Sequence, residues 1–303
     1  MVCEKVEQNP LFHFLIFLHL YTFLKFFMRI FRKGAVALLE HEGQWYQSKQ
    51  LWNDLIRQPH LYKRLKSQLS LWRQIDFPDL TDIDAPIGEQ EVWASGVTYL
   101  RSKAARMEES KDAGGGDFYD RVYDADRPEL FFKAPYYKVV APGGTVNIRR
   151  DSNWNVPEPE LTLLISQTGT IEGYTCGNDM SSRSIEGENP LYLTQAKVYD
   201  GSAALGPGIL VQEEPLDRET TIKLSIIRGG EAVFEESIKV AQIKRSFQEL
   251  VEYLYLASSF ENGCFLMTGT GIIPPDEFSL VEHDEVQISI DGIGTLINYV
   301  GVR

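Results

Sequence analysis

The feature that most constrains this chain is a pair of glutamates at the start of a predicted β-hairpin. Glu158 and Glu160 are two residues apart, and in an extended chain such residues point to the same side. Leu161–Gln167 has the composition of a strand, and Ile171–Cys176 has that of a returning strand. Because Thr168–Gly169 between them contains a turn-forming glycine, the segment predicts an antiparallel hairpin.

The register of this hairpin brings in a third carboxylate. With a two-residue loop, Glu160 lies opposite Gly177 and Glu158 lies opposite Asp179. Directly opposed residues project from the same side of a sheet, so the three carboxylates are expected to lie close together. A four-residue loop about the same centre keeps this pairing, whereas a three-residue loop would break it.

Three carboxylates in one place need a counter-charge. They repel one another, and burying them uncompensated costs on the order of several kcal/mol. Because ligand sets made only of oxygen suit Mg²⁺, Mn²⁺ and Ca²⁺, the hairpin predicts a divalent metal site. The alternative is a set of solvated carboxylates at the strand ends, which a glutamate pair alone does not exclude.

Composition narrows the class of protein. With 303 residues, 43% hydrophobic and 24% charged, the chain can bury a full core, as one large domain or as a large and a small one. Its net charge of −13 argues against nucleic-acid binding, which needs a basic surface. The three cysteines form no C-x-x-C motif and no even set, which favours a reducing compartment, so a cytoplasmic location is expected.

Residues 1–27 differ from the rest of the chain. Leu11–Phe27 is dominated by Leu, Phe and Ile and is long enough for a marginal membrane helix. Glu4 and Glu7 spoil a basic leader region, and no small-residue cleavage site follows, so a signal peptide is excluded. We interpret Met28 as the authentic start and the residues before it as not functional. A peripheral membrane anchor is the alternative, although membrane association is not expected.

Beyond this extension we expect two domains. Residues 28–85 are predicted to form a small N-terminal domain with a polar helix over Leu51–Leu71, and residues 86–303 a larger second domain. The larger domain is predicted to contain a helix over Tyr99–Glu109 and another that begins at the capping box Ser246–Glu249. Strand-like segments outnumber the helices, which indicates an α+β fold that is mainly β.

Four motifs, taken in order, resemble one known family. They are P-E-P-E-L, G-N-D-M-S-S-R-S-I-E, Q-A-K-V-Y-D-G and T-G-T-G-I. Together they resemble the fumarylacetoacetate hydrolase superfamily, from about Ala94 to the C-terminus. The longer run R-S-I-E-G-E-N-P-L-Y-L-T-Q-A-K is similar to the branch of 2-keto-3-deoxyarabinonate dehydratases. The resemblance implies a fumarylacetoacetase C-terminal-like rolled β-sandwich that assembles as a homodimer or homotetramer.

The resemblance also implies roles for individual residues. Glu158, Glu160 and Asp179 would hold Mg²⁺, with Mn²⁺ as the alternative ion. Lys133 lies on a predicted strand over Leu130–Ala134 that points it toward the site, unless it is an exposed lysine. The residues expected to act on or bind the substrate are Lys197, Arg183, Glu108, Glu109, Lys133, Thr270 and Glu186.

A lysine near a metal ion needs an explanation, because like charges repel. Lys197 fits beside a metal if an anionic ligand lies between them, where its ammonium would hold a carboxylate or stabilise enolate charge. A Schiff base through Lys197 is the alternative, and we rank it lower because a bound metal already polarises the carbonyl.

The expected substrate is a small anionic 2-keto acid. The resemblance favours a Mg²⁺-dependent dehydratase that converts a 2-keto-3-deoxypentonate into 2-oxoglutarate semialdehyde. A C–C bond hydrolase or a 2-oxo acid decarboxylase of the same family is the first alternative. Some members of those groups carry a histidine where this chain has Thr98–Ser102, so its absence favours the dehydratase. A non-catalytic metabolite-binding protein, tethered to a membrane through Leu11–Phe27, is the second alternative.

Overall fold

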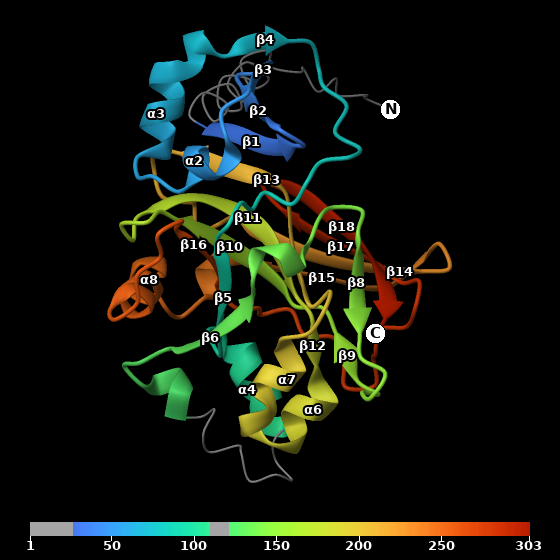
Figure 1. Ribbon diagram of the computed structural model, residues 1–303. Coiled ribbons are helices and arrows are strands. Elements are labelled where there is room, and N and C mark those ends of the chain that lie inside the picture. The colour runs from blue at the N-terminus through green and yellow to red at the C-terminus, as the bar shows by residue number, and fades with distance from the viewer. Residues whose placement is uncertain (1–26, 110–120) are drawn as a thin grey trace, which may run out of the picture.

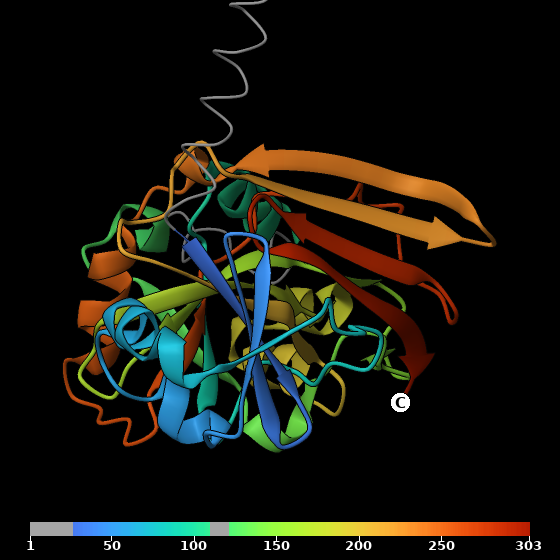
Figure 2. The same cartoon turned by 90° about the horizontal axis from the view of Figure 1, so that it is seen from above.

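The computed structural model describes residues 27–109 and 121–303. Within these ranges, an eleven-stranded sheet and a five-stranded sheet pack face to face, and helices lie around them (Figure 1). Figure 2 shows the strands of the five-stranded sheet along one side of the molecule. The predicted α+β fold with mainly β content is therefore confirmed.

The eleven-stranded sheet carries the predicted hairpin at its centre. Ten strands follow one another across it, and a short parallel strand, β7 (Val139–Val140), pairs with β13. In spatial order the ten are β4 (Arg73–Ile75), β3 (Gln44–Ser48), β2 (Val36–His41), β1 (Phe27–Lys33), β13 (Ala203–Gln212), β11 (Ile171–Asp179), β10 (Pro159–Ile165), β16 (Cys264–Met267), β5 (Glu91–Gly96) and β6 (Glu129–Ala134).

The remaining strands form two smaller sheets. The five-stranded sheet has the order β15 (Glu231–Lys239), β14 (Thr221–Arg228), β17 (Glu285–Ile290), β18 (Gly294–Val302) and β8 (Thr145–Ile148). A two-stranded sheet pairs β12 (Ser181–Ser182) with β9 (Asn155–Val156).

The helices are short. Among the described residues, the α-helices include α2 (Trp52–Ile56), α3 (Leu61–Gln68), α4 (Leu100–Glu109), α6 (Arg183–Glu188), α7 (Leu193–Lys197) and α8 (Phe247–Tyr255). The 3₁₀ helices are η1 (Leu69–Leu71), η2 (Tyr136–Lys138), η3 (Pro190–Tyr192) and η4 (Val240–Gln242). Among the described residues, no helix is long and apolar enough to cross a membrane.

Strand β10 is buried on both sides, and its alternation decides which side chains face which layer. Leu161, Leu163 and Ile165 belong to the core between the two large sheets. Glu160, two residues from Thr162 and four from Leu164, projects from the other side. The sandwich core therefore holds one side of the hairpin fixed, and the other side is left for the carboxylates.

The N-terminal strands extend the large sheet. β1 pairs antiparallel with β13, with Met28 opposite Val211, and Met28 and Ile30 pack in the same core cluster as Leu205. The N-terminal segment thus shares a sheet and a core cluster with the larger predicted domain. The division into domains at residue 85 remains a prediction. Residues 1–26 lie outside the described part of the chain, and so do the expectations of a later start and of a membrane anchor.

The predicted helix over Leu51–Leu71 is wrong as a single element. The chain forms α2 and α3 with a break between Arg57 and His60, followed by the 3₁₀ turn η1. Pro59 explains the break, because proline lacks an amide N–H and disfavours helical geometry in the residue before it. His60 at the start of α3 adopts a left-handed conformation, with φ of 60°.

Ser246→Ala is expected to lower the free energy of unfolding by about 1 kcal/mol. The N-cap half of the predicted capping box is present, because the amide of Glu249 donates to Ser246 Oγ at 3.1 Å at the start of α8, while the Glu249 carboxylate pairs with Arg245. Alanine leaves this amide without its partner. Urea denaturation measures the change, with exposed Ser70→Ala as the control; equal losses in the two variants would contradict the capping role.

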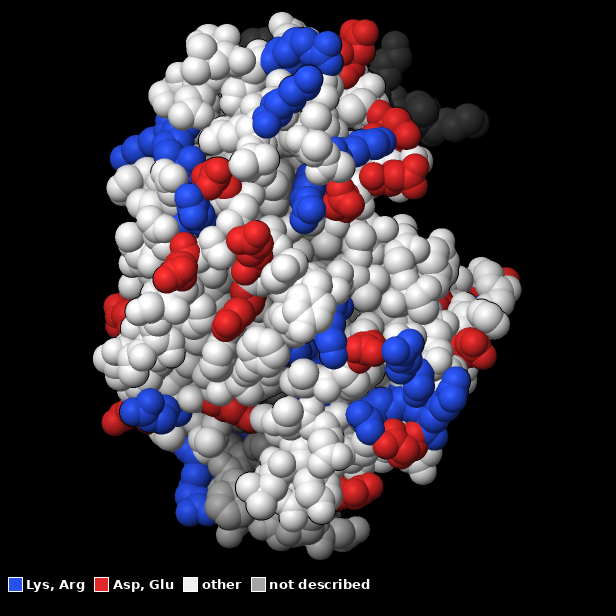
Figure 3. All heavy atoms as spheres, viewed as in Figure 1, with Lys and Arg blue, Asp and Glu red and all other residues white. Residues whose placement is uncertain are grey.

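Charged side chains are mixed on the molecular surface. On the face shown in Figure 3, described Lys and Arg side chains are interspersed with Asp and Glu and form no continuous basic band.

Candidate metal centre

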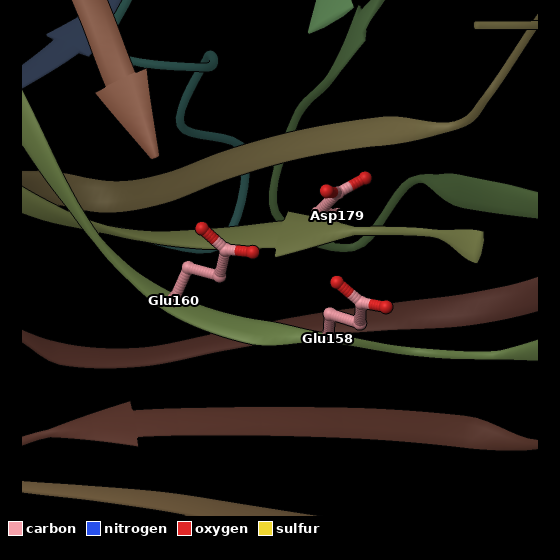
Figure 4. Close-up of side chains that lie close together, drawn as sticks. All are labelled: Glu158, Glu160 and Asp179. Atoms are coloured by element: carbon pink, nitrogen blue, oxygen red, sulfur yellow. The ribbon is translucent and has the colours of Figure 1, made fainter. Parts of the chain in front are cut away.

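The β10–β11 hairpin brings the two glutamates and the aspartate together as predicted. Glu160 pairs with Gly177, and the amide of Asp179 donates to the carbonyl of Glu158 at 3.0 Å. Figure 4 shows the three side chains converging from the two strands. One oxygen from each carboxylate lies within 4.8 Å of the others.

The loop of the hairpin differs from the prediction, yet the register survives. The loop has three residues, Gln167–Gly169, and Ile165 pairs with Ile171. A β-bulge then restores the predicted pairing, because Glu172 is an extra residue on β11. The Glu172 carboxylate accepts the amide of Leu61 at 2.7 Å, so a contact with α3 holds the bulge in place.

The three carboxylates are almost completely buried. Glu158 is 4% exposed, and Glu160 and Asp179 are each 1% exposed. Burial, together with the negative charges of Asp179 and Glu158, raises the pKa of Glu160 well above its usual range. A divalent cation would compensate the repulsion between these three buried acids. Because all of their ligand atoms are oxygens, the site fits a hard cation such as Mg²⁺ or Mn²⁺.

Two cations from the segment after the hairpin contact this cluster. Lys197, the last residue of α7, donates to Glu158 Oε2 at 2.7 Å and to Asp179 Oδ2 at 3.1 Å. Arg183, the first residue of α6, donates to Glu158 Oε1 at 3.0 Å. Both are buried, so these ion pairs lie where water screens them little.

Lys133 reaches the cluster from β6. Its side chain is fully buried, and its ammonium lies 2.5 Å from Asp179 Oδ1. The same ammonium donates to the carbonyl oxygens of Met180 and Lys197. Burial lowers the pKa of Lys133, and the charge of Asp179 opposes that change. The exposed-lysine alternative is therefore excluded.

The T-G-T-G-I segment closes the site from the end of β16. The amide of Gly269 donates to Glu160 Oε2 at 2.5 Å, so the anion bound by this loop is the protein's own carboxylate. Gly269 has φ of 91°, and a Cβ there would lie 2.0 Å from Thr98 Oγ1. Only glycine fits at this position.

A small pocket lies beside the carboxylates. Glu158, Asp179, Arg183, Lys197 and Thr270 line it, so several of the predicted site residues do share one space. Their roles toward a substrate remain predictions.

Three other predicted residues are placed differently. Glu186 is buried, and its carboxylate accepts a hydrogen bond from the hydroxyl of Ser181 at 3.1 Å. It is not one of the described residues that line the cavity. Glu108 and Glu109 end α4, and their side chains lie outside the described part of the structure.

Sequence reasoning missed several groups around the cavity. Ser95 and Phe131 line it, and the carboxylate of Glu129 lies against Gly96, another lining residue. Glu129 and Phe131 alternate with Lys133 along β6, so all three share a side of that strand. Because Lys133 was expected to point toward the site, the two-residue period of a strand would have predicted the same for Phe131 and Glu129.

Comparison with known proteins agrees with this architecture. The family model for the fumarylacetoacetate (FAA) hydrolase C-terminal region matches residues 92–301. A "Probable 2-keto-3-deoxyxylonate dehydratase" of Haloferax volcanii is 47% identical over 216 residues, which cover 71% of this chain and 73% of that protein. A "2-dehydro-3-deoxy-D-arabinonate dehydratase" of Saccharolobus solfataricus is 40% identical over 238 residues, which cover 77% and 79%.

A solved structure extends the similarity to three dimensions. It is described as "2-keto-3-deoxy-D-arabinonate dehydratase complexed with magnesium and 2,5-dioxopentanoate". It superposes with a TM-score of 0.78 at 32% identity, covering 91% of this chain and 99% of its own. The resemblance noted in the motifs is thus confirmed over most of the chain, which belongs to the fumarylacetoacetate hydrolase family.

Proposed function

We propose that the protein is a Mg²⁺-dependent dehydratase of a 2-keto-3-deoxypentonate. The observation that carries this proposal is the buried cluster of Glu158, Glu160 and Asp179, two of which line one pocket together with Lys197. Two dehydratases at 47% and 40% identity support the reaction, and a related structure that contains magnesium and 2,5-dioxopentanoate supports the ion and the product.

The metal fits the residues present. Glu158, Glu160 and Asp179 would hold it, because together they offer buried oxygen ligands that need a positive partner. When bound, Mg²⁺ would draw electrons from the keto group of a 2-oxo acid and so acidify its C3 protons. Mn²⁺ suits the same ligand set.

The cationic side chains would then bind the substrate carboxylate and stabilise the negative charge that develops during the reaction. Lys197 lines the cavity, and its ammonium would stabilise the negative charge that develops as a proton leaves C3. Arg183 lines the same cavity and would face the substrate carboxylate, while Thr270 would contact the substrate from the other side. The proton carrier is left unassigned, with Glu108 and Glu109 as candidates.

Loss of water follows from the position of the hydroxyl. A hydroxyl on C4 is β to the C2 carbonyl, so it can leave once charge has built up on C3. The lost C3 proton and C4 hydroxyl make one water and leave a double bond between C3 and C4. Removal of a proton from C5 and protonation at C3 move this double bond to C4=C5, which makes an enol at C5. Tautomerisation of that enol gives 2-oxoglutarate semialdehyde, also called 2,5-dioxopentanoate. The pocket is lined by Arg183 and Lys197 as well as by the carboxylates, and these two cations suit an anionic sugar acid.

The 2-keto-3-deoxy acids derived from arabinonate and from xylonate are the same compound when both sugars belong to the D series. D-Arabinonate and D-xylonate differ at C2 and C3, and neither carbon is a stereocentre in the 2-keto-3-deoxy form. Only the configuration at C4 remains to be selected. We therefore propose the D form as substrate, since one relative is described as acting on the D-arabinonate derivative.

Incubation with a small panel of acids tests this function. We expect the 2-keto-3-deoxy-D-pentonate to be consumed with Mg²⁺ or Mn²⁺ and its L epimer to react more slowly. Chelation with EDTA should abolish the reaction, and added Mg²⁺ should restore it, because the carboxylates alone do not polarise a carbonyl. Consumption of acylpyruvates instead would point to the C–C bond hydrolase, and binding of the acids without turnover would point to a metabolite-binding protein.

The assembly proposed from the family resemblance is a homodimer or homotetramer. The location proposed is cytoplasmic, because Cys176 and Cys264 are free, as is usual in a reducing compartment. Size-exclusion chromatography with light scattering measures the assembly directly.

A further inference from the structure

Lys133 is a buried lysine whose ammonium is surrounded by acceptors that belong to the protein. Its side chain is 0% exposed. The ammonium lies 2.5 Å from Asp179 Oδ1 and donates to the carbonyl oxygens of Met180 and Lys197. A lysine ammonium has three N–H donors, and three acceptors surround this one.

Lys133 also lies behind the cavity. Among the described residues, Lys197 and Asp179 line the cavity and Lys133 does not. Asp179 directs Oδ1 at Lys133 and Oδ2 at Lys197, which donates to it at 3.1 Å. Lys133 therefore fixes the rotation of this carboxylate, so that the opposite oxygen points toward Glu158 and the cavity.

The two carbonyl contacts extend this effect to the backbone. Met180 directly follows Asp179 at the end of β11, and Lys197 ends α7. β6, which supplies Lys133, lies four positions from β11 in the sheet order, so only the curvature of the sheet brings them together. One ammonium thus ties the end of β11 to the end of α7, the two segments that carry Asp179 and Lys197.

We propose that Lys133 is a positioning residue of the metal centre, which holds Asp179 and the end of α7 in place and does not contact the substrate. This role rests on the proposed function, since it presumes that Asp179 holds the metal. It replaces the substrate contact that the sequence led us to expect for Lys133.

The experiment compares Lys133→Met with Lys138→Met, a control that removes a half-exposed lysine from the adjoining η2 turn. Calorimetry measures Mg²⁺ binding without substrate, and then binding of pyruvate, a 2-oxo acid without a C4 hydroxyl, at saturating Mg²⁺. We expect Lys133→Met to weaken Mg²⁺ binding by about 10- to 100-fold, as loss of a partner that orients a metal ligand usually does. Pyruvate affinity at saturating Mg²⁺ and both constants of Lys138→Met should match the wild type.

Two outcomes would overturn the proposal. Unchanged Mg²⁺ affinity with weaker pyruvate binding would make Lys133 a substrate contact. Tighter Mg²⁺ binding would mean that Lys133 acts mainly by repelling the cation, because its removal would then relieve a like-charge interaction. If Lys133→Met does not fold, Lys133→Gln takes its place, since glutamine keeps donors for the carbonyls, and the same two readings apply.

Failure of the proposed function would look different. If the wild type binds Mg²⁺ but neither binds pyruvate nor dehydrates the pentonate, the substrate assignment fails while the Mg²⁺ comparison still tests Lys133. If the wild type does not bind Mg²⁺, the metal site itself is disproved and the role of Lys133 falls with it.

Discussion

Glu160→Gln is expected to lower Mg²⁺-dependent turnover by at least about 1,000-fold, because the loss of metal polarisation removes several kcal/mol of transition-state stabilisation. Glutamine preserves the shape of the side chain but removes the negative charge from the centre of the cluster. The amide of Gly269 can still donate to the remaining carbonyl oxygen, so the loop after β16 should stay in place. Steady-state turnover over a range of Mg²⁺ concentrations measures the loss.

The same variant should be more stable than the wild type without metal. Burial and the charges of Asp179 and Glu158 raise the pKa of Glu160 above its unfolded value. Such a group stabilises the fold below its unfolded pKa, and that contribution is lost as pH rises through the folded pKa. At pH 7, above the unfolded pKa, Glu160 must either take up a proton on folding or be buried with its charge, and both cost free energy in the metal-free fold. Glu160→Gln removes this cost and should raise the Tm.

Glu172→Gln is the matched control for this prediction. Glu172 is a buried glutamate of the same hairpin, and it accepts the amide of Leu61 rather than facing the cavity. Its replacement should leave Mg²⁺-dependent turnover near that of the wild type. Full activity of Glu160→Gln, or an equal loss in both variants, would show that the charge of Glu160 does not hold the metal.

Lys197→Met is expected to lower kcat by about 100- to 1,000-fold, the range found when a group that stabilises developing negative charge is removed. The ammonium of Lys197 pairs with Glu158 and Asp179 and lines the cavity, so it stands beside the ligands of the proposed metal. Methionine has nearly the same length and carries no charge. Initial rates at saturating substrate and Mg²⁺ give the change in kcat.

The competing Schiff-base role of Lys197 predicts a different chemistry. An amine that forms an imine with a 2-oxo acid is trapped as a stable adduct by borohydride. With pyruvate as the acid, we expect mass spectrometry to show no adduct on the wild type, because two carboxylates already pair with the nitrogen of Lys197. An adduct that is lost in Lys197→Met would replace electrostatic stabilisation with covalent catalysis. Lys138→Met again serves as the control.

The metal centre was predictable because its three acids are close in the sequence. Glu158 and Glu160 share a side through the period of a strand, and one hairpin pairing places Asp179 beside them. Even the wrong loop length did not spoil this prediction, since the bulge at Glu172 cancelled the shift. The bulge is accompanied by a contact between Glu172 and Leu61 of α3. The sequence of the hairpin does not predict this contact, because α3 belongs to another part of the chain.

The sequence alone determined the mainly β fold, the hairpin and its cluster of acids, because strand periodicity and turn residues act over short stretches of chain. Only the tertiary structure decided what surrounds those acids. Lys133 arrives from β6 and Gly269 from the end of β16, and their contacts with Asp179 and Glu160 depend on how the large sheet orders and curves its strands. Such contacts leave no periodic trace in the sequence, since each is made between segments that the chain brings together only when the whole core is packed.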